Sequence, residues 1–260
     1  MMKKIAFLAA LTSATLSSLA AAQDGPRLWS DLAESRAMDF QQQGPDGRGR
    51  GGQVTEEWYT PRVRASLAIY GRVSFPSDTD VTVDGLWYSD FFDPGLGLSV
   101  EGDLLTYINP GWGVGGYLSV GWDRFEGQRI NFFNGDFAEP DHMDLTSVIV
   151  GGKVVQRFSP FFGWDGHLGI GAVHYSSVKW SGFDITIPGP FTNEELFAST
   201  TTVVGEIAGR FIFGSPHVEG DLGFGIRIMG GPRRGRDVSS AIDPDILTTF
   251  MIELGLTVRF

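Results

Sequence analysis

The chain has 260 residues, a formal net charge of −11 at pH 7, 36 glycines and no cysteine. Without cysteine, neither disulfides nor a cysteine-linked lipid anchor can form. Hydrophobic residues make up 42% of the chain, an ordinary share that excludes a bundle of membrane-spanning helices.

The first 22 residues have the pattern of a secretory signal peptide. Lys3 and Lys4 precede a short apolar run, and small residues follow it up to Ala22. The run is shorter than the roughly 20 residues that a membrane-spanning helix needs, so we expect export and cleavage after Ala22. In residues 23–60, the Gly-, Gln- and Arg-rich stretch 41–53 cannot bury a core. We therefore predict an exported N-terminal extension and flexible linker over 23–60, followed by one domain over 61–260.

From residue 61 onward, apolar and polar side chains alternate. A period of two is typical of a strand whose two faces have different surroundings. Leu67 and Ile69, for example, fall on one face of the first stretch, and Arg64 and Arg72 fall on the other. The last stretch is apolar at every even position and ends on Phe260. We predict eight strands, near 63–75, 96–104, 112–123, 147–157, 167–172, 203–213, 218–228 and 250–260.

The connections between these strands alternate in length. Three are short turns rich in Pro and Gly, at 109–111, 159–163 and 214–216. The other four, near 76–94, 124–142, 177–197 and 230–247, each exceed a dozen residues. Short turns at one end and long loops at the other are the arrangement of outer-membrane β-barrels. An even number of strands then places both ends of the barrel domain on the short-turn side.

Over residues 61–260 this pattern resembles the small Gram-negative outer-membrane barrels of the OmpA and OmpW types, and the terminal Phe260 resembles their C-terminal assembly signal. The resemblance implies an all-β fold: an eight-stranded antiparallel transmembrane up-and-down β-barrel with short periplasmic turns and long external loops. It also implies an outer-membrane location, with residues 23–60 in the periplasm.

The partners that follow from this resemblance are outer-membrane lipid, lipopolysaccharide, and the barrel assembly machinery, which would bind the C-terminal strand. Arg233, Arg234 and Arg236 in the last long connection suit phosphate groups of lipopolysaccharide, and a solvated loop is the alternative. We expect no nucleic acid, cofactor or metal ion, since the four histidines lack the spacing of metal ligands.

Charged residues fall on the face opposite the large apolar side chains, so we expect them inside the barrel. Eight strands leave an interior that side chains just fill, and an unpaired buried charge costs several kcal/mol. We therefore predict a barrel of the porin-like, outer-membrane class whose lumen is plugged by a network of charges and contains no large pore. Its seven cations and seven carboxylates are Arg64, Arg72, Lys153, Arg157, Arg210, Arg227 and Arg259, with Glu101, Asp103, Asp123, Glu206, Glu219, Asp221 and Glu253.

Two pairs of aromatic residues have the spacing expected at the boundaries of a membrane. Trp112 and Trp122 lie ten residues apart on one face, and Phe250 and Phe260 repeat that spacing. At about 3.3 Å per residue and a tilt near 45°, ten residues rise about 23 Å. Because the apolar band between aromatic girdles is about 25 Å tall, we predict that these four residues form such a girdle.

One pair of residues suggests chemistry. His174 and Ser176 share a face at the outer end of the fifth strand, where a histidine can act as the base for a serine nucleophile. The pair resembles the His-x-Ser-Asn motif of the lipid A deacylase family, although Ser177 replaces the Asn and the acid would be Asp184 or Glu194. We favour a non-enzymatic envelope or surface role and assign no catalytic residue. A lipid A acyl hydrolase and an OmpW-like conduit for small apolar molecules are the alternatives.

Overall fold

The computed structural model describes residues 63–77, 86–109, 111–131, 135–159, 161–183, 190–215, 217–236 and 244–260. The expected signal peptide, the extension over 23–60 and Asp184 lie outside the described residues.

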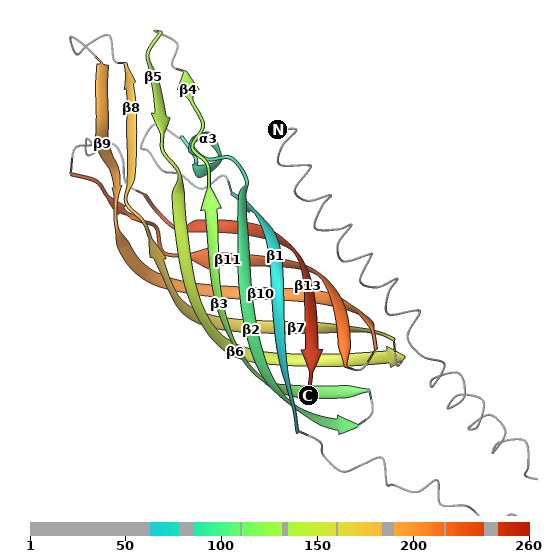
Figure 1. The fold of residues 1–260 in the computed structure, drawn as a ribbon. Helices are drawn as coiled ribbons and strands as arrows, with labels where there is room; N and C mark the ends of the chain where they lie inside the picture. Colours follow the sequence, from blue (N-terminus) through green and yellow to red (C-terminus); the bar gives the residue numbers. More distant parts are fainter. Residues whose placement is uncertain are drawn as a thin grey trace, which may run out of the picture. The chain divides into compact units, whose positions relative to one another are not determined.

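Eight antiparallel strands close into a barrel in the order β1-β13-β11-β10-β7-β6-β3-β2 (Figure 1). They are β1 (Val63–Pro76), β2 (Gly95–Asn109), β3 (Trp112–Phe125), β6 (Met143–Ser159), β7 (Phe162–Tyr175), β10 (Thr200–Gly214), β11 (Val218–Met229) and β13 (Leu247–Arg259). The predicted fold class is confirmed. Pairing between the first and last strands, from Ser66 with Arg259 to Pro76 with Thr249, closes the barrel.

The alternation in sequence becomes an inside and an outside. In β1, Leu67 and Ile69 point outward and are exposed, whereas Ala68 and Tyr70 point inward and are buried. Glycines on the inner face leave room for long side chains. A Cβ atom on Gly255, for example, would overlap the ring of Tyr70. The many glycines therefore allow a narrow barrel to hold large polar side chains.

The long connections contain more structure than loops alone. Five short strands from them pair in the order β12-β9-β8-β5-β4. They are β4 (Ile130–Asn131), β5 (Phe137–Pro140), β8 (Val178–Phe183), β9 (Pro190–Ala198) and β12 (Arg233–Arg234), and the first connection carries the short helix α3 (Tyr88–Phe91). In Figure 1, β4, β5, β8 and β9 extend beyond one end of the barrel, which we call the loop end. The opposite end, with the short connections, is the short-turn end.

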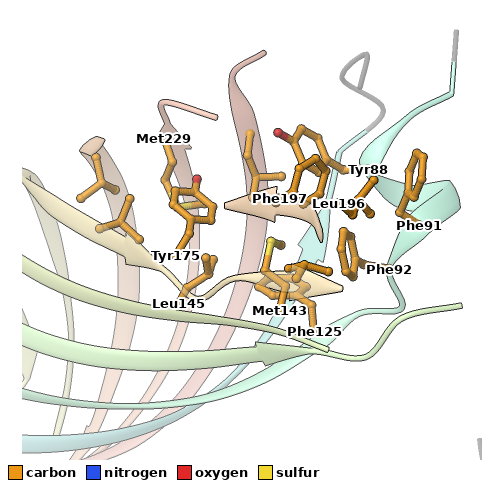
Figure 2. Packing of buried hydrophobic residues seen from close by; sticks show 14 of the residues in the cluster. Tyr88, Phe91, Phe92, Phe125, Met143, Leu145, Tyr175, Leu196, Phe197 and Met229 are labelled. Carbon is orange, nitrogen blue, oxygen red and sulfur yellow. The ribbon is translucent and has the colours of Figure 1, made fainter. Parts of the chain in front are cut away.

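Apolar side chains fill the barrel at the loop end. Figure 2 shows Tyr88 and Phe92 near Phe197 of β9, with ring centroids 6.3 and 6.4 Å from that of Phe197. Burial raises the pKa of Tyr88, so its hydroxyl stays protonated and donates to the carbonyl of Asp245 at 3.3 Å. We call this cluster the apolar plug. Its buried members are Tyr88, Phe91, Phe92, Tyr117, Phe125, Met143, Leu145, Ile149, Val173, Tyr175, Val178, Leu196, Phe197, Val204, Met229 and Leu247.

Candidate functional site: the barrel lumen

The centre of the lumen holds a network of ion pairs around Lys153 and Arg210. The ammonium of Lys153 on β6 donates to Glu101 at 2.7 Å and to Asp103 at 2.9 Å, both on β2. The guanidinium of Arg210 on β10 donates to both carboxylate oxygens of Glu101 at 3.0 Å and to Glu253 on β13 at 3.1 Å. The five side chains are 3% exposed or less. Since β2 and β10 are not neighbours in the barrel, these contacts cross the lumen.

The same network continues toward the loop end. Arg72 donates to the two carboxylate oxygens of Asp123 at 2.5 and 2.6 Å. Arg227 reaches Asp123 at 3.2 Å and Glu206 at 2.5 Å, and His167 Nε2 lies 3.3 Å from Glu206. A forked contact between arginine and carboxylate fixes both groups in one plane. Strands on opposite sides of the barrel are thus joined by buried, charge-assisted hydrogen bonds.

Hydroxyl groups of Tyr70, Tyr117 and Thr257 contact the buried charges. Arg210 donates to the hydroxyl of Tyr70 at 3.1 Å, and its guanidinium carbon lies 4.0 Å from the centre of that ring. Tyr117 lies beside Glu206, to which its hydroxyl donates at 3.4 Å. On β13, Thr257 donates to Asp221 at 2.6 Å. These hydrogen bonds offset part of the cost of burying the charges in a low-dielectric interior.

A separate group of charges lies at the short-turn end, and we call it the mouth cluster: Arg64, Arg157, Arg259 and Glu219, with Tyr107. Arg157 and Arg259 both donate to the fully buried Glu219, Arg259 at 2.9 Å. Arg259 also donates to the hydroxyl of Tyr107 at 2.7 Å. Arg64 lies over the Tyr107 ring, 5.5 Å from its centre, and makes no ion pair within the described residues.

The structure adds the side chains of Asp165 and His167 to the lumen charges expected from the sequence. Asp165 lies 3.6 Å from Lys153 Nζ and 3.3 Å from Nδ1 of His167. The fifth strand is predicted to begin at residue 167, whereas β7 begins at Phe162, so the prediction places Asp165 between the turn at 159–163 and the strand. Asp165 lies two residues before His167 and therefore on the same face of the strand, so the alternation of the sequence predicts an inward position for both side chains. The central network therefore contains four permanent cations, Arg72, Lys153, Arg210 and Arg227, and six carboxylates, Glu101, Asp103, Asp123, Asp165, Glu206 and Glu253.

The four proposed girdle residues lie on the outer surface of the barrel. Trp112 and Trp122 are near the two ends of β3, and Phe250 and Phe260 are near the two ends of β13. Each is at least 39% exposed. Other aromatic side chains share the outer surface at the short-turn end, where Phe162 stacks against Phe158 and Phe211, among others. In the sequence, only their position on the outward face of a strand marks these additional rings.

His174 and Ser176 lie at the loop end of β7, but each contacts other groups. The two ring nitrogens of His174 lie 3.0 Å from the Thr201 hydroxyl and 3.4 Å from the Ser199 hydroxyl. The hydroxyl of Ser176 accepts a hydrogen bond from the backbone N–H of Asp144 at 3.0 Å. No hydrogen bond joins His174 to Ser176 in the part of the chain that the structure describes.

No group of three or more His, Cys, Asp or Glu side chains among the described residues is arranged to hold a metal ion. Within the same residues, no helix combines the length and hydropathy of a membrane-spanning segment.

No protein-family model matches the chain, and no curated protein matches it significantly. The chain is similar in structure to Ail, the attachment invasion locus protein of Yersinia pestis, with 16% identity over 76% of this chain and 99% of that chain and a TM-score of 0.41. It is also similar to the outer membrane protease OmpT from Escherichia coli (9% identity, 76% and 96% covered, TM-score 0.43) and to the outer membrane enzyme PagL (8%, 72% and 97%, 0.41). At such identities and TM-scores these likenesses carry no argument about what this barrel binds or does.

Proposed function

We propose that this chain is an integral outer-membrane β-barrel with a structural or surface-interaction role and a closed lumen. The observation that carries this proposal is that apolar side chains cover the outside of the barrel and charged side chains are buried inside it. Outward-facing Leu104, Leu168 and Ile170 are more than 60% exposed, while the charges of the central network are buried. Exposing so much contiguous apolar surface to water is unfavourable by about 25 cal/mol per Å². A hydrocarbon environment removes that cost.

The girdle residues support the same placement. Trp112 and Trp122 lie on one strand with the outward-facing Val114, Leu118 and Val120 between them. Aromatic rings are favoured at the two membrane–water interfaces, and aliphatic side chains are favoured between them. In this placement the short turns face the periplasm and the second sheet, β12-β9-β8-β5-β4, lies outside the cell. Residues 23–60 would lie in the periplasm after cleavage of the signal peptide.

A closed lumen favours a scaffold over a conduit. The central network crosses the barrel with ion pairs, and the apolar plug fills the loop end above it. A polar solute would have to pass Phe92 and Phe197, whereas an apolar solute would have to displace paired charges. An OmpW-like passage of small apolar molecules along the barrel axis therefore requires both layers to rearrange.

The hydrolase alternative lacks an assembled nucleophile and base. In the described residues His174 contacts the hydroxyls of Thr201 on β10 and of Ser199, which precedes β10. The hydroxyl of Ser176 accepts a hydrogen bond from the backbone N–H of Asp144. We therefore retain the non-enzymatic role.

The proposed external partner is lipopolysaccharide. Arg233 and Arg234 form β12 at the edge of the second sheet, and both they and Arg236 are exposed. Guanidinium groups present paired donors that match phosphate oxygens. The C-terminal strand, ending at Phe260, is the proposed contact with the barrel assembly machinery.

The experiment that tests this function uses the purified full chain added to preformed lipid vesicles and to planar bilayers. We expect an SDS-resistant, heat-modifiable band that forms only with lipid or detergent, and no large steady conductance. A chain that folds to the same barrel in buffer alone would refute the membrane placement. A porin-like steady conductance would refute the closed lumen.

A further inference from the structure

The charges inside the barrel are separated along its axis. The central network has four permanent cations and six carboxylates, and even a protonated His167 leaves it with one excess negative charge. The mouth cluster has the opposite excess: Arg157 and Arg259 pair with the one carboxylate of Glu219, and Arg64 adds a third guanidinium that lies over the Tyr107 ring. The two groups of charges therefore do not compensate each other by contact.

An apolar layer on three of the eight strands, β2, β6 and β10, lies between the two clusters. Leu105, Val155 and Ile212 are fully buried and pack together. On β6, Val155 is the inward residue between Lys153 of the central network and Arg157 of the mouth cluster. No ion pair among the described residues crosses this layer. The positive charge at the mouth must therefore be balanced locally or by a group that enters from the short-turn end.

The described residues supply fewer carboxylates than guanidinium groups at the mouth. Glu219 accepts from both Arg157 and Arg259. Asp221, the next inward residue on β11, is engaged by the hydroxyl of Thr257. If Asp221 is also counted, three guanidinium groups face two carboxylates. In addition, Nη1 of Arg157 is buried and has no hydrogen-bond partner.

We propose that the mouth cluster binds the phosphoryl group of an anion from the periplasmic side, with Arg157 and Arg259 as its principal ligands and Arg64 at its edge. This inference goes beyond the proposed scaffold function. An unpaired buried donor and neighbouring like charges both favour an added anion. A phosphoryl group has three terminal oxygens and suits several guanidinium forks at once, which a single carboxylate cannot do. Arg64 and Arg157 are only partly buried, so the cluster is reachable from the short-turn end.

The test measures the thermal unfolding midpoint of the full chain, folded in micelles of a non-ionic detergent. Inorganic phosphate is titrated at constant ionic strength, with sodium chloride as the compensating salt, since a ligand that binds only the folded state raises the midpoint. A second titration adds phosphatidylglycerol to the micelles. We expect the midpoint to rise with phosphate, with phosphatidylglycerol, or with both. A response to phosphate alone identifies a free phosphate as the source, and a response to the lipid alone identifies a headgroup.

The variants decide whether the mouth cluster is responsible. Arg157→Gln removes one guanidinium, and we expect it to raise the half-saturating concentration by about tenfold, the worth of one charge-assisted hydrogen bond. Arg124→Gln is the matched control, because Arg124 lies on the outer surface at the opposite end of β3. If Arg157→Gln does not fold, Arg64→Gln at the edge takes its place.

Two results would overturn the proposal. One is a wild-type midpoint that follows ionic strength alone, with no added effect of phosphate or phosphatidylglycerol. The other is a phosphate response that Arg157→Gln, or Arg64→Gln in its place, retains in full. The heat-modifiable band of the same samples reports separately whether the barrel is folded, so a failed anion site and a failed membrane barrel are distinguishable.

Discussion

Replacing Lys153 by methionine should destabilise the barrel severely. The ammonium is 1% exposed and lies within 3.6 Å of three carboxylates, those of Glu101, Asp103 and Asp165. Methionine fills a similar volume but supplies no charge or donor, so the central network would keep three permanent cations against six carboxylates. Removing one partner of a buried ion pair costs about 3–5 kcal/mol.

Equilibrium unfolding in urea, in lipid vesicles, measures this cost. With a slope of about 2 kcal/mol per M, Lys153→Met should lower the midpoint by about 2 M. Lys179→Met is the matched control, because Lys179 is exposed on β8 and its loss should change the free energy of unfolding by less than about 0.5 kcal/mol.

A double substitution tests the cause of the loss. Asp103 contacts one cation, Lys153, among the described residues, and also accepts a hydrogen bond from Ser66 at 2.5 Å. Lys153→Met combined with Asp103→Asn should therefore cost less than the sum of the two single changes. If Lys153→Met is no worse than Lys179→Met, or if the two changes simply add, the electrostatic reasoning fails.

Two further predictions concern assembly and chemistry. Deleting Phe260, an outward-facing terminal residue that is 75% exposed, should sharply lower the amount of heat-modifiable protein in the outer membrane, measured against deletion of an exposed loop residue such as Gly135. Unchanged levels would contradict a role for Phe260 in recognition by the assembly machinery. Purified protein should release no fatty acid from lipid A, since His174 and Ser176 are not hydrogen-bonded to each other. Release that disappears in both Ser176→Ala and His174→Gln would establish the hydrolase.

The strands and their two faces follow from the sequence because strand parity is local. The period of two in residues 63–75 already separates Leu67 and Ile69 from Arg72, and the barrel places them outside and inside, respectively. The same rule predicts fourteen inward charges without any knowledge of their partners. It missed Asp165 because the start of the fifth strand was placed too late, although the parity of Asp165 matches that of His167.

The partners of those charges were decided only by the tertiary structure. The contact between Arg210 and Glu101 joins residues 109 positions apart across the barrel. Which side chains meet there depends on the stagger between strands, and a change of register would alter every such pair. The apolar plug is equally non-local, since Phe92 and Phe197 meet only after two long connections fold over the loop end (Figure 2). Sequence alone therefore determined which face each residue occupies, because parity is set by the backbone of one strand. Closure of the barrel decided how the charges pair and divide between centre and mouth, because that depends on distances between strands that are remote in the chain.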